Sequence, residues 1–201
     1  MIPEVQKIRW PKKLPSLLFA GIAIGVVSFV IGLATDSQRA WANFLLEYFF
    51  WITVAIGGVF FVALQHITGS SWSAPLRRIP EAFVAYLPAA ALLFIVLCFG
   101  LHSIYEWTHE QVVAQDAILK LKVGYLNIPF FAFRNVGLLA IAGIAGFLMT
   151  RNSLRQDVSG DIALTQKNTT ISAVFLLLFA WSFSFASFDL IMSLAPHWFS
   201  T

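Results

Sequence analysis

The 201-residue chain is strongly apolar: hydrophobic residues make up 59% of it, charged residues 11%, and the mean hydropathy is +0.79. Soluble domains are about a quarter charged, so this composition indicates an integral membrane protein and excludes an ordinary soluble domain. The net charge of +3 is small and lies mostly in the connections, which gives no basis for a nucleic-acid partner. The single cysteine excludes an internal disulfide and any site built from several cysteines, such as an iron–sulfur cluster.

Five apolar stretches are each long enough to form a transmembrane helix, which needs roughly 20 mostly apolar residues. An all-α integral membrane domain over residues 1–201 is therefore expected. The predicted transmembrane helices cover residues 14–34, 44–66, 81–101, 128–149 and 170–194.

The basic residues are distributed unevenly over the connections between these helices. Nine of the 13 Lys and Arg residues precede the first helix or lie in the second–third and fourth–fifth connections, and three lie in the other two connections. Cytoplasmic loops are enriched in Lys and Arg. The sequence therefore predicts a cytoplasmic N-terminus and, after five crossings, an external C-terminus.

Three ionisable residues, Glu47, Arg134 and Asp189, lie inside predicted helices. At 1.5 Å per residue they lie roughly 5 to 9 Å from the outer ends of those helices, at a similar depth. A charge in hydrocarbon is costly and persists where it pairs, meets water or carries protons. We expect Arg134 to pair with Glu47 or Asp189, leaving one carboxylate able to titrate. Alternatively, Glu47 reaches the interface and the other two form a purely structural ion pair.

Polar residues also share one face of the last helix. Ser182, Asp189 and Ser193 are spaced by seven and four, so they form a single stripe, and His197 follows at the outer surface. Such a stripe can hold water and relay protons, although serines bonded to their own helix backbone give the same pattern without any function. The candidate site, a proton path or a quinone-adjacent cluster, comprises Glu47, Arg134, Ser182, Asp189 and His197.

Small residues and prolines predict local features of the helices. Gly21 with Gly25, and Ala142 with Gly146, form small-xxx-small pairs that favour close helix packing in lipid. Pro88 is expected to kink the third helix. In the long outer connection, the amphipathic segment 110–123 predicts one helix lying on the surface.

The histidines do not predict a haem site. His66 lies at the inner end of its helix without a histidine at its level, whereas His102, His109 and His197 lie at or beyond the outer surface. Two axial histidines would have to face one cavity at one depth, and no Cys-x-x-Cys-His, phosphate-binding or dinucleotide motif is present. No metal or cofactor is predicted for this chain itself. Redox chemistry would need a diffusible quinone or a partner subunit.

Three segments carry a family resemblance: residues 44–65, the connection 72–81 (WSAPLRRIPE) and the ending 188–201 (FDLIMSLAPHWFST). They resemble the ActF-type membrane subunits of alternative complex III, in the NrfD/polysulfide-reductase membrane-anchor superfamily. The resemblance implies about ten helices in two four-helix bundles with flanking helices. This chain would be the N-terminal half, with one leading helix and then one four-helix bundle. Ala195 stands where many relatives have an acidic residue, which argues against a proton role for that outer loop.

The resemblance implies a membrane subunit of a quinol:electron-acceptor oxidoreductase in the bacterial inner membrane, not catalytic alone. Its implied partners are lipids, an NrfD-like quinol-binding membrane subunit, an iron–sulfur subunit and c-type cytochrome subunits, so haem c and iron–sulfur clusters would belong to those partners. Quinol would bind near the outer side of the bundle. Two alternatives remain: a purely structural anchor for redox subunits, and a transporter fragment, for which Pro88 and Gly57-Gly58 are the only hints.

Overall fold

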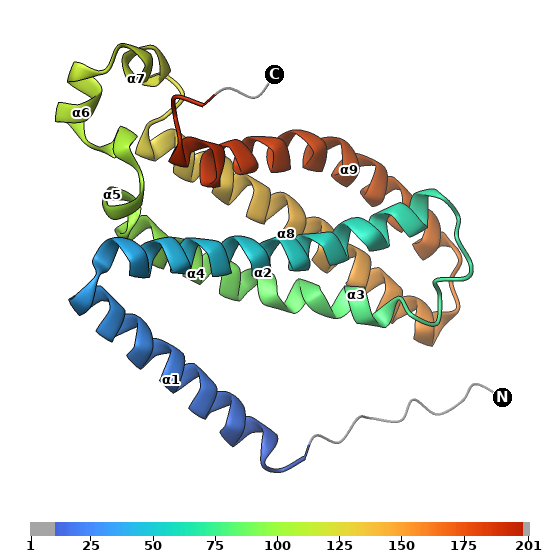
Figure 1. Ribbon diagram of the computed structural model, residues 1–201. Coiled ribbons are helices and arrows are strands. Elements are labelled where there is room, and N and C mark those ends of the chain that lie inside the picture. Colours follow the sequence, from blue (N-terminus) through green and yellow to red (C-terminus); the bar gives the residue numbers. More distant parts are fainter. Residues whose placement is uncertain (1–10, 199–201) are drawn as a thin grey trace.

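The computed structural model describes residues 11–198, and all regular structure in that part of the chain is helical (Figure 1). The basic residues Lys7 and Arg9, used above for orientation, and the final residues 199–201 of the resembling segment lie outside it. Within these residues, five helical segments are long and apolar enough to cross a membrane, which confirms the prediction of an all-helical chain with five such segments. These segments are Leu14–Thr35, Ser37–Ile67, Arg78–Phe99, Ile128–Ser159 and Ala163–Leu194.

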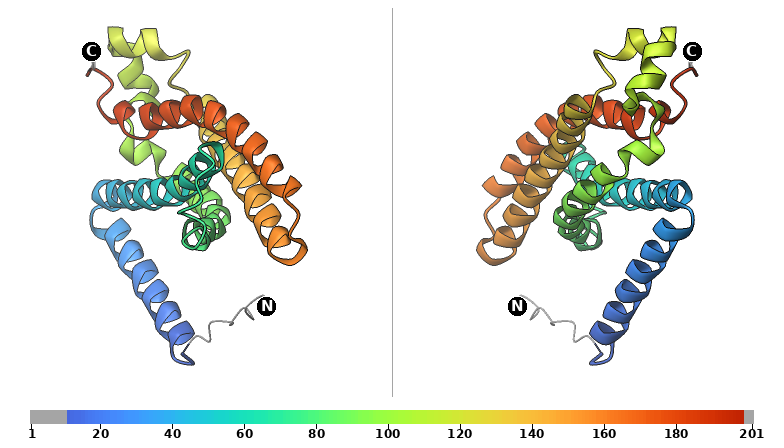
Figure 2. Two further views of the ribbon diagram at one scale, coloured as in Figure 1. Left: turned by 90° about the vertical axis from the view of Figure 1, so that its right-hand side faces the viewer. Right: turned by 90° about the vertical axis from the view of Figure 1, so that its left-hand side faces the viewer.

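The first two helices, α1 (Leu14–Thr35) and α2 (Ser37–Ile67), are joined by a single residue, Asp36. Its carboxylate accepts a hydrogen bond from the Arg39 backbone N–H at 3.0 Å and so caps α2. Because of this cap, α2 begins at Ser37 and not at residue 44 as predicted. In the views of Figures 1 and 2, α1 runs away from the other helices, and none of its residues is buried against residues 11–198.

The third span consists of α3 (Arg78–Ala82), the 3₁₀ turn η1 (Phe83–Tyr86) and α4 (Leu87–Phe99). The tighter turn ends at Tyr86, two residues before Pro88, which lacks an N–H and whose ring would collide in a regular α-helix with the carbonyl four residues earlier. The span is therefore irregular next to Pro88, where a kink is predicted. Helix α2 approaches this turn closely at Gly58, where an added Cβ would lie 2.8 Å from both Phe83 Cδ2 and the Pro80 carbonyl oxygen.

Helices α8 (Ile128–Ser159) and α9 (Ala163–Leu190) form a long antiparallel pair, closed by Gly160 at φ 67°. Asn127 caps α8 by accepting from the Phe130 N–H at 3.0 Å. The predicted boundaries at residues 149 and 170 are wrong because polar turns extend both helices past the apolar stretches. Gln156 Nε2, for example, donates to Thr165 Oγ1 across the pair at 2.7 Å.

The connection between α4 and α8 is built of short helices. They are α5 (Leu101–Ile104), η2 (Glu106–Thr108), α6 (Glu110–Gln115) and α7 (Ala117–Lys122), and a further 3₁₀ turn, η3 (Met192–Leu194), follows α9. The single helix predicted over 110–123 is broken at Asp116, whose backbone is extended at φ −103° and ψ 118°. Its carboxylate instead caps α7 by accepting from the Ile118 and Leu119 N–H groups at 2.8 and 3.0 Å.

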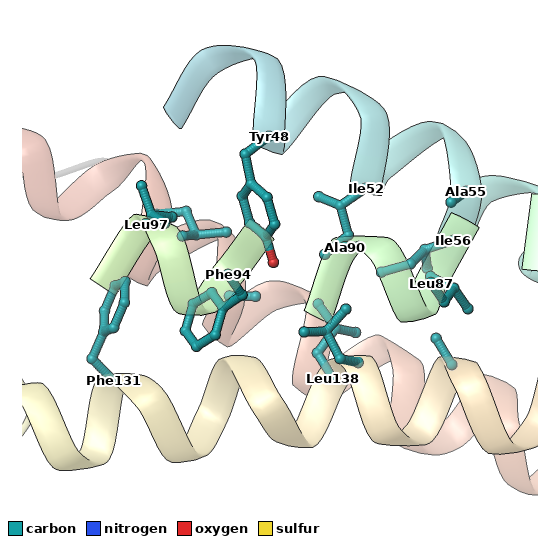
Figure 3. Packing of buried hydrophobic residues seen from close by; sticks show 14 of the residues in the cluster. Tyr48, Ile52, Ala55, Ile56, Leu87, Ala90, Phe94, Leu97, Phe131 and Leu138 are labelled. Carbon is teal, nitrogen blue, oxygen red and sulfur yellow. The ribbon is translucent and has the colours of Figure 1, made fainter. Parts of the chain in front are cut away.

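The core lies where α2, α4, α8 and α9 meet, and Figure 3 shows side chains of α2 and α4 interleaved above α8. Helices in lipid associate through close contact of small residues. Ala142 is fully buried, and a Cβ on Gly146 would lie 2.8 Å from Val84 Cγ2, so the predicted packing role of this pair is confirmed. For the other pair, a Cβ added at Gly21 or Gly25 would meet nothing within 4 Å, so residues 11–198 supply no partner for it.

The two ends of the bundle differ in charge. The end that carries the α2–α3 connection and the α8–α9 turn, on the right in Figure 1, holds Arg77, Arg78, Arg151, Arg155 and Lys167, and is called the basic end. The connection over residues 100–127 and the segment after α9 lie together at the other end, called the opposite end (Figure 1).

Candidate functional site

The centre of the candidate site is an ion pair between Arg134 of α8 and Asp189 of α9, near the opposite end. Arg134 Nε donates to Asp189 Oδ2 and Nη2 donates to Oδ1, both at 2.6 Å. The side chains are only 7% and 0% exposed, respectively. The prediction that Arg134 pairs with an acidic residue is confirmed, and of the two candidates the partner is Asp189. Both carboxylate oxygens are engaged in a fork-shaped, charge-assisted contact, the strongest kind of hydrogen bonding that arginine makes.

Neighbouring groups complete the surroundings of the guanidinium. Arg134 Nη2 also donates to the Tyr125 carbonyl oxygen at 3.0 Å, and the guanidinium carbon lies 3.9 and 4.2 Å from the ring centroids of Tyr125 and Phe130. The third nitrogen, Nη1, is buried and makes no hydrogen bond within residues 11–198. Aromatic faces attract cations, so these two rings replace part of the lost hydration. On the other side, Asn135 Nδ2 lies 3.4 Å from Asp189 Oδ2.

The same region fastens the connection over residues 100–127 to the end of α9. The Tyr105 hydroxyl donates to the Leu190 carbonyl oxygen at 2.9 Å, and Trp107 Nε1 donates to Ser193 Oγ at 3.2 Å. Burial, reinforced by the nearby Asp189 charge, raises the pKa of Tyr105, so its hydroxyl remains a neutral donor. With the Arg134–Tyr125 contact, these bonds join the connection, α8 and α9 into one rigid unit.

A second, more exposed contact ties the segment after α9 to α7. His197 Nε2 lies 2.5 Å from Asp116 Oδ2, and Lys122 Nζ donates to the Pro196 carbonyl oxygen at 2.5 Å. The Leu119 N–H at the start of α7, together with His197, lowers the pKa of Asp116 below its ordinary value. His197 is thus engaged by α7. The hydroxyl of Ser193, which lies between His197 and Asp189 in sequence, donates to the Asp189 backbone carbonyl and not to its carboxylate.

The remaining predicted site residues lie apart from this pair. Glu47 is exposed on α2 and makes no ion pair or hydrogen bond with the described part of the chain. Ser182 donates to the Leu178 carbonyl oxygen of its own helix at 2.8 Å, which is the backbone-bonding alternative given above. Of the five candidate residues, the structure brings together Arg134 and Asp189, and separately brings His197 onto α7.

A buried polar cluster at the basic end was missed by the sequence analysis. Asn168 is fully buried, and its Nδ2 donates to the Met149 carbonyl oxygen at 3.1 Å while its Oδ1 accepts from Asn152 Nδ2 at 2.8 Å. His66 Nε2 lies 3.4 Å from the same amide nitrogen. The predicted helix begins at residue 170, so Asn168 lies outside it. The two asparagines flanking a short polar turn were the available signal.

Chemically, the Arg134–Asp189 site can hold charge in a dry environment and fix three segments relative to one another. Within residues 11–198, no three His, Cys, Asp or Glu side chains are grouped so as to hold a metal ion. No protein-family model and no curated protein matches this chain. The family resemblance therefore stands on the three sequence segments alone.

Proposed function

We propose that this chain is a membrane subunit of a quinol:electron-acceptor oxidoreductase of the alternative complex III type, and that it anchors partner subunits in the bilayer. The observation that carries the proposal of a multi-subunit assembly is helix α1. It is a 22-residue apolar helix that leaves the bundle with none of its residues buried against the described chain. Its Gly21 and Gly25 present a close-packing face to open space. Such a face suits a helix of a neighbouring subunit.

The kind of complex is supported by the resemblance of residues 44–65, 72–81 and 188–201 to the ActF-type subunits. In this proposal the rigid unit at the opposite end is the surface that c-type cytochrome and iron–sulfur subunits approach, and an NrfD-like subunit binds quinol beside the bundle. The Arg134–Asp189 pair holds residues 100–127 in the position in which these partner subunits bind them. Its geometry supports this role because both oxygens of the carboxylate are engaged by one guanidinium.

A proton path through Asp189 is the second candidate, and one observation favours it. Arg134 Nη1, on the guanidinium that binds Asp189, is a buried donor without a hydrogen bond in the described residues, and such a donor calls for an ordered water or a functional role. Asp189→Asn preserves the shape and removes the charge. If Asp189 relays protons outward, with His197 as the exit group, the variant complex assembles but loses quinol oxidation or coupled proton release. Normal turnover and proton stoichiometry in an assembled Asp189→Asn complex exclude the relay.

The main proposal is tested by purifying the affinity-tagged chain from its native membranes in a mild detergent. We expect haem c absorbance, iron and quinol-oxidising activity to purify with the chain. A chain that purifies alone, without haem or iron, contradicts the proposal and favours the transporter alternative.

A variant of α1 tests which surface holds the partners. Gly21→Leu/Gly25→Leu adds side chains where nothing lies within 4 Å, so it leaves the chain's own packing intact. We expect it to release haem and iron from the purified chain. Gly137→Leu on α8 is the matched control, because a Cβ at Gly137 also meets nothing within 4 Å. Retention of the partners by the α1 double variant, at the level of the control, would show that α1 is not the docking helix.

A further inference from the structure

An apolar cleft opens at the basic end, between η1 and the last turns of α8. Its volume is about 880 Å³, and its walls include Val84, Ala85, Phe147 and Leu154. Phe147 and Leu154 are 60% and 54% exposed, so the described residues leave this apolar surface uncovered. Along the cleft, α8 runs from its apolar stretch at Phe147 to a polar final part that ends at Ser159. The cleft therefore extends from the hydrocarbon depth to the polar surface at the basic end.

Two arginines stand at the polar rim of this cleft. Arg151 and Arg155 both line it and are four residues apart on α8, so they share one face of the helix. Both are exposed, and neither makes an ion pair or hydrogen bond within residues 11–198. Their positive charges are therefore available to a ligand.

The acidic residues near the cleft are already engaged. Arg78 binds both Glu81 and Asp157, so these two carboxylates are held by a third arginine. Together with Arg151 and Arg155, the group carries three positive and two negative charges and keeps a net charge of +1. Glu81, which also lines the cleft, is 3% exposed, and its second oxygen, Oε1, is buried without a hydrogen bond in the described part of the chain. The cleft is thus lined by a buried acceptor without a donor and by two arginines without a partner in the described residues. This combination favours a ligand that carries both an anionic group and a hydroxyl donor.

We propose that the cleft binds an anionic glycerophospholipid of the leaflet on the basic side. An acyl chain lies between η1 and α8, and the phosphate pairs with Arg151 and Arg155. Guanidinium groups match phosphate oxygens in pairs of hydrogen bonds, and basic pockets between transmembrane helices hold anionic headgroups. An apolar partner helix would cover the apolar walls equally well but would provide no negative charge to pair with the two arginines. Charge complementarity therefore selects the lipid.

The experiment titrates the purified full chain, in neutral detergent, with palmitoyl-oleoyl phosphatidylglycerol or the matching phosphatidylcholine and measures the first bound lipid by native mass spectrometry. We expect tighter binding of the phosphatidylglycerol. Arg151→Gln/Arg155→Gln should weaken phosphatidylglycerol binding by about 30-fold, equivalent to about 2 kcal/mol for two cations near an anionic surface, and leave phosphatidylcholine binding unchanged. Arg39→Gln/Lys120→Gln is the matched control, since it removes the same charge from exposed positions at the opposite end.

A second variant separates the cleft from its rim. Ala85→Trp fills the exposed wall and leaves both arginines in place, so it should also reduce phosphatidylglycerol binding. Circular dichroism confirms that each variant is folded. Equal affinity of the wild-type chain for the two lipids overturns the proposal and leaves the cleft to a partner helix. It is also overturned if the rim variant behaves like the control, or if Ala85→Trp binds phosphatidylglycerol as the wild type does.

Discussion

Removing one member of the Arg134–Asp189 pair should destabilise the bundle far more than replacing both. Arg134→Met strands a buried carboxylate and Asp189→Leu strands a buried guanidinium, and breaking a buried pair in this way costs about 3–5 kcal/mol. Replacing both with apolar residues removes the stranded charge. The Tyr125 carbonyl then loses its guanidinium donor, at about 1–3 kcal/mol, whereas the Asn135 amide keeps its bond to the Phe131 carbonyl oxygen. The two single losses add up to about 6–10 kcal/mol. The double variant should therefore lose much less free energy of unfolding than this sum.

The measurement is the free energy of unfolding in mixed micelles, titrated with a denaturing detergent and followed by circular dichroism. Glu47→Ala is the control, because that exposed side chain has no partner in the described residues and its loss should stay within about 0.5 kcal/mol. The reasoning is refuted if Arg134→Met costs no more than Glu47→Ala. It is equally refuted if the double variant loses the full sum of the single variants, because the two charges would then act independently.

Three further predictions address orientation, packing and pH. In a cysteine-free background, Gln111→Cys should react with an external thiol reagent and Ser71→Cys should not; the reverse result would invert the orientation. Gly146→Leu should lower the free energy of unfolding by about 1–3 kcal/mol through overpacking, whereas Gly143→Leu, which meets open space, should not. Folding lowers the pKa of Asp116 from its ordinary 3.8, so its contacts stabilise α7 above that pH and are lost as the pH falls through the lowered value. Hydrogen exchange in the first turn of α7, corrected for intrinsic rates, should accelerate over that acidic range, and Asp116→Asn should remove this dependence.

The number of long helices could be predicted because their apolar residues are contiguous, but their ends could not be predicted from hydropathy. Asp36 shows the reason, since this single capping side chain decides where α2 begins. The start of α8 at Ile128 agrees with the prediction, and there the cap, Asn127, directly precedes the apolar stretch. The same error occurs at Asn168, which lies before the predicted start of its helix although it is part of α9, where its amide is satisfied by Met149 and Asn152. Hydropathy averages over such local hydrogen bonds.

The candidate site was predictable in part for a related reason. The cost of an unpaired charge in lipid requires Arg134 to have an acidic partner, and that requirement follows from sequence. The choice between the two carboxylates depends on rotation about the helix axis, which depth alone does not specify. Asp189 faces α8, whereas Glu47 is exposed on α2. Ser182 is among the predicted site residues because it shares a helix face with Asp189. A shared face does not place two side chains in one hydrogen-bond network, and Ser182 bonds to its own helix instead.

The separation of Arg134 and Asp189 in the sequence has a consequence for how the chain would insert into a membrane. Arg134 and Asp189 are 55 positions apart, so during synthesis the cation emerges well before its carboxylate. Until then, α8 must carry an unneutralised arginine, which costs up to about 2.5–3.5 kcal/mol in translocon-mediated insertion. We therefore expect α8 to settle in the bilayer only when α9 joins it as a hairpin. A nascent chain truncated after Gly160 should leave α8 accessible to modifying enzymes, and efficient insertion of that truncated chain would contradict this order of events.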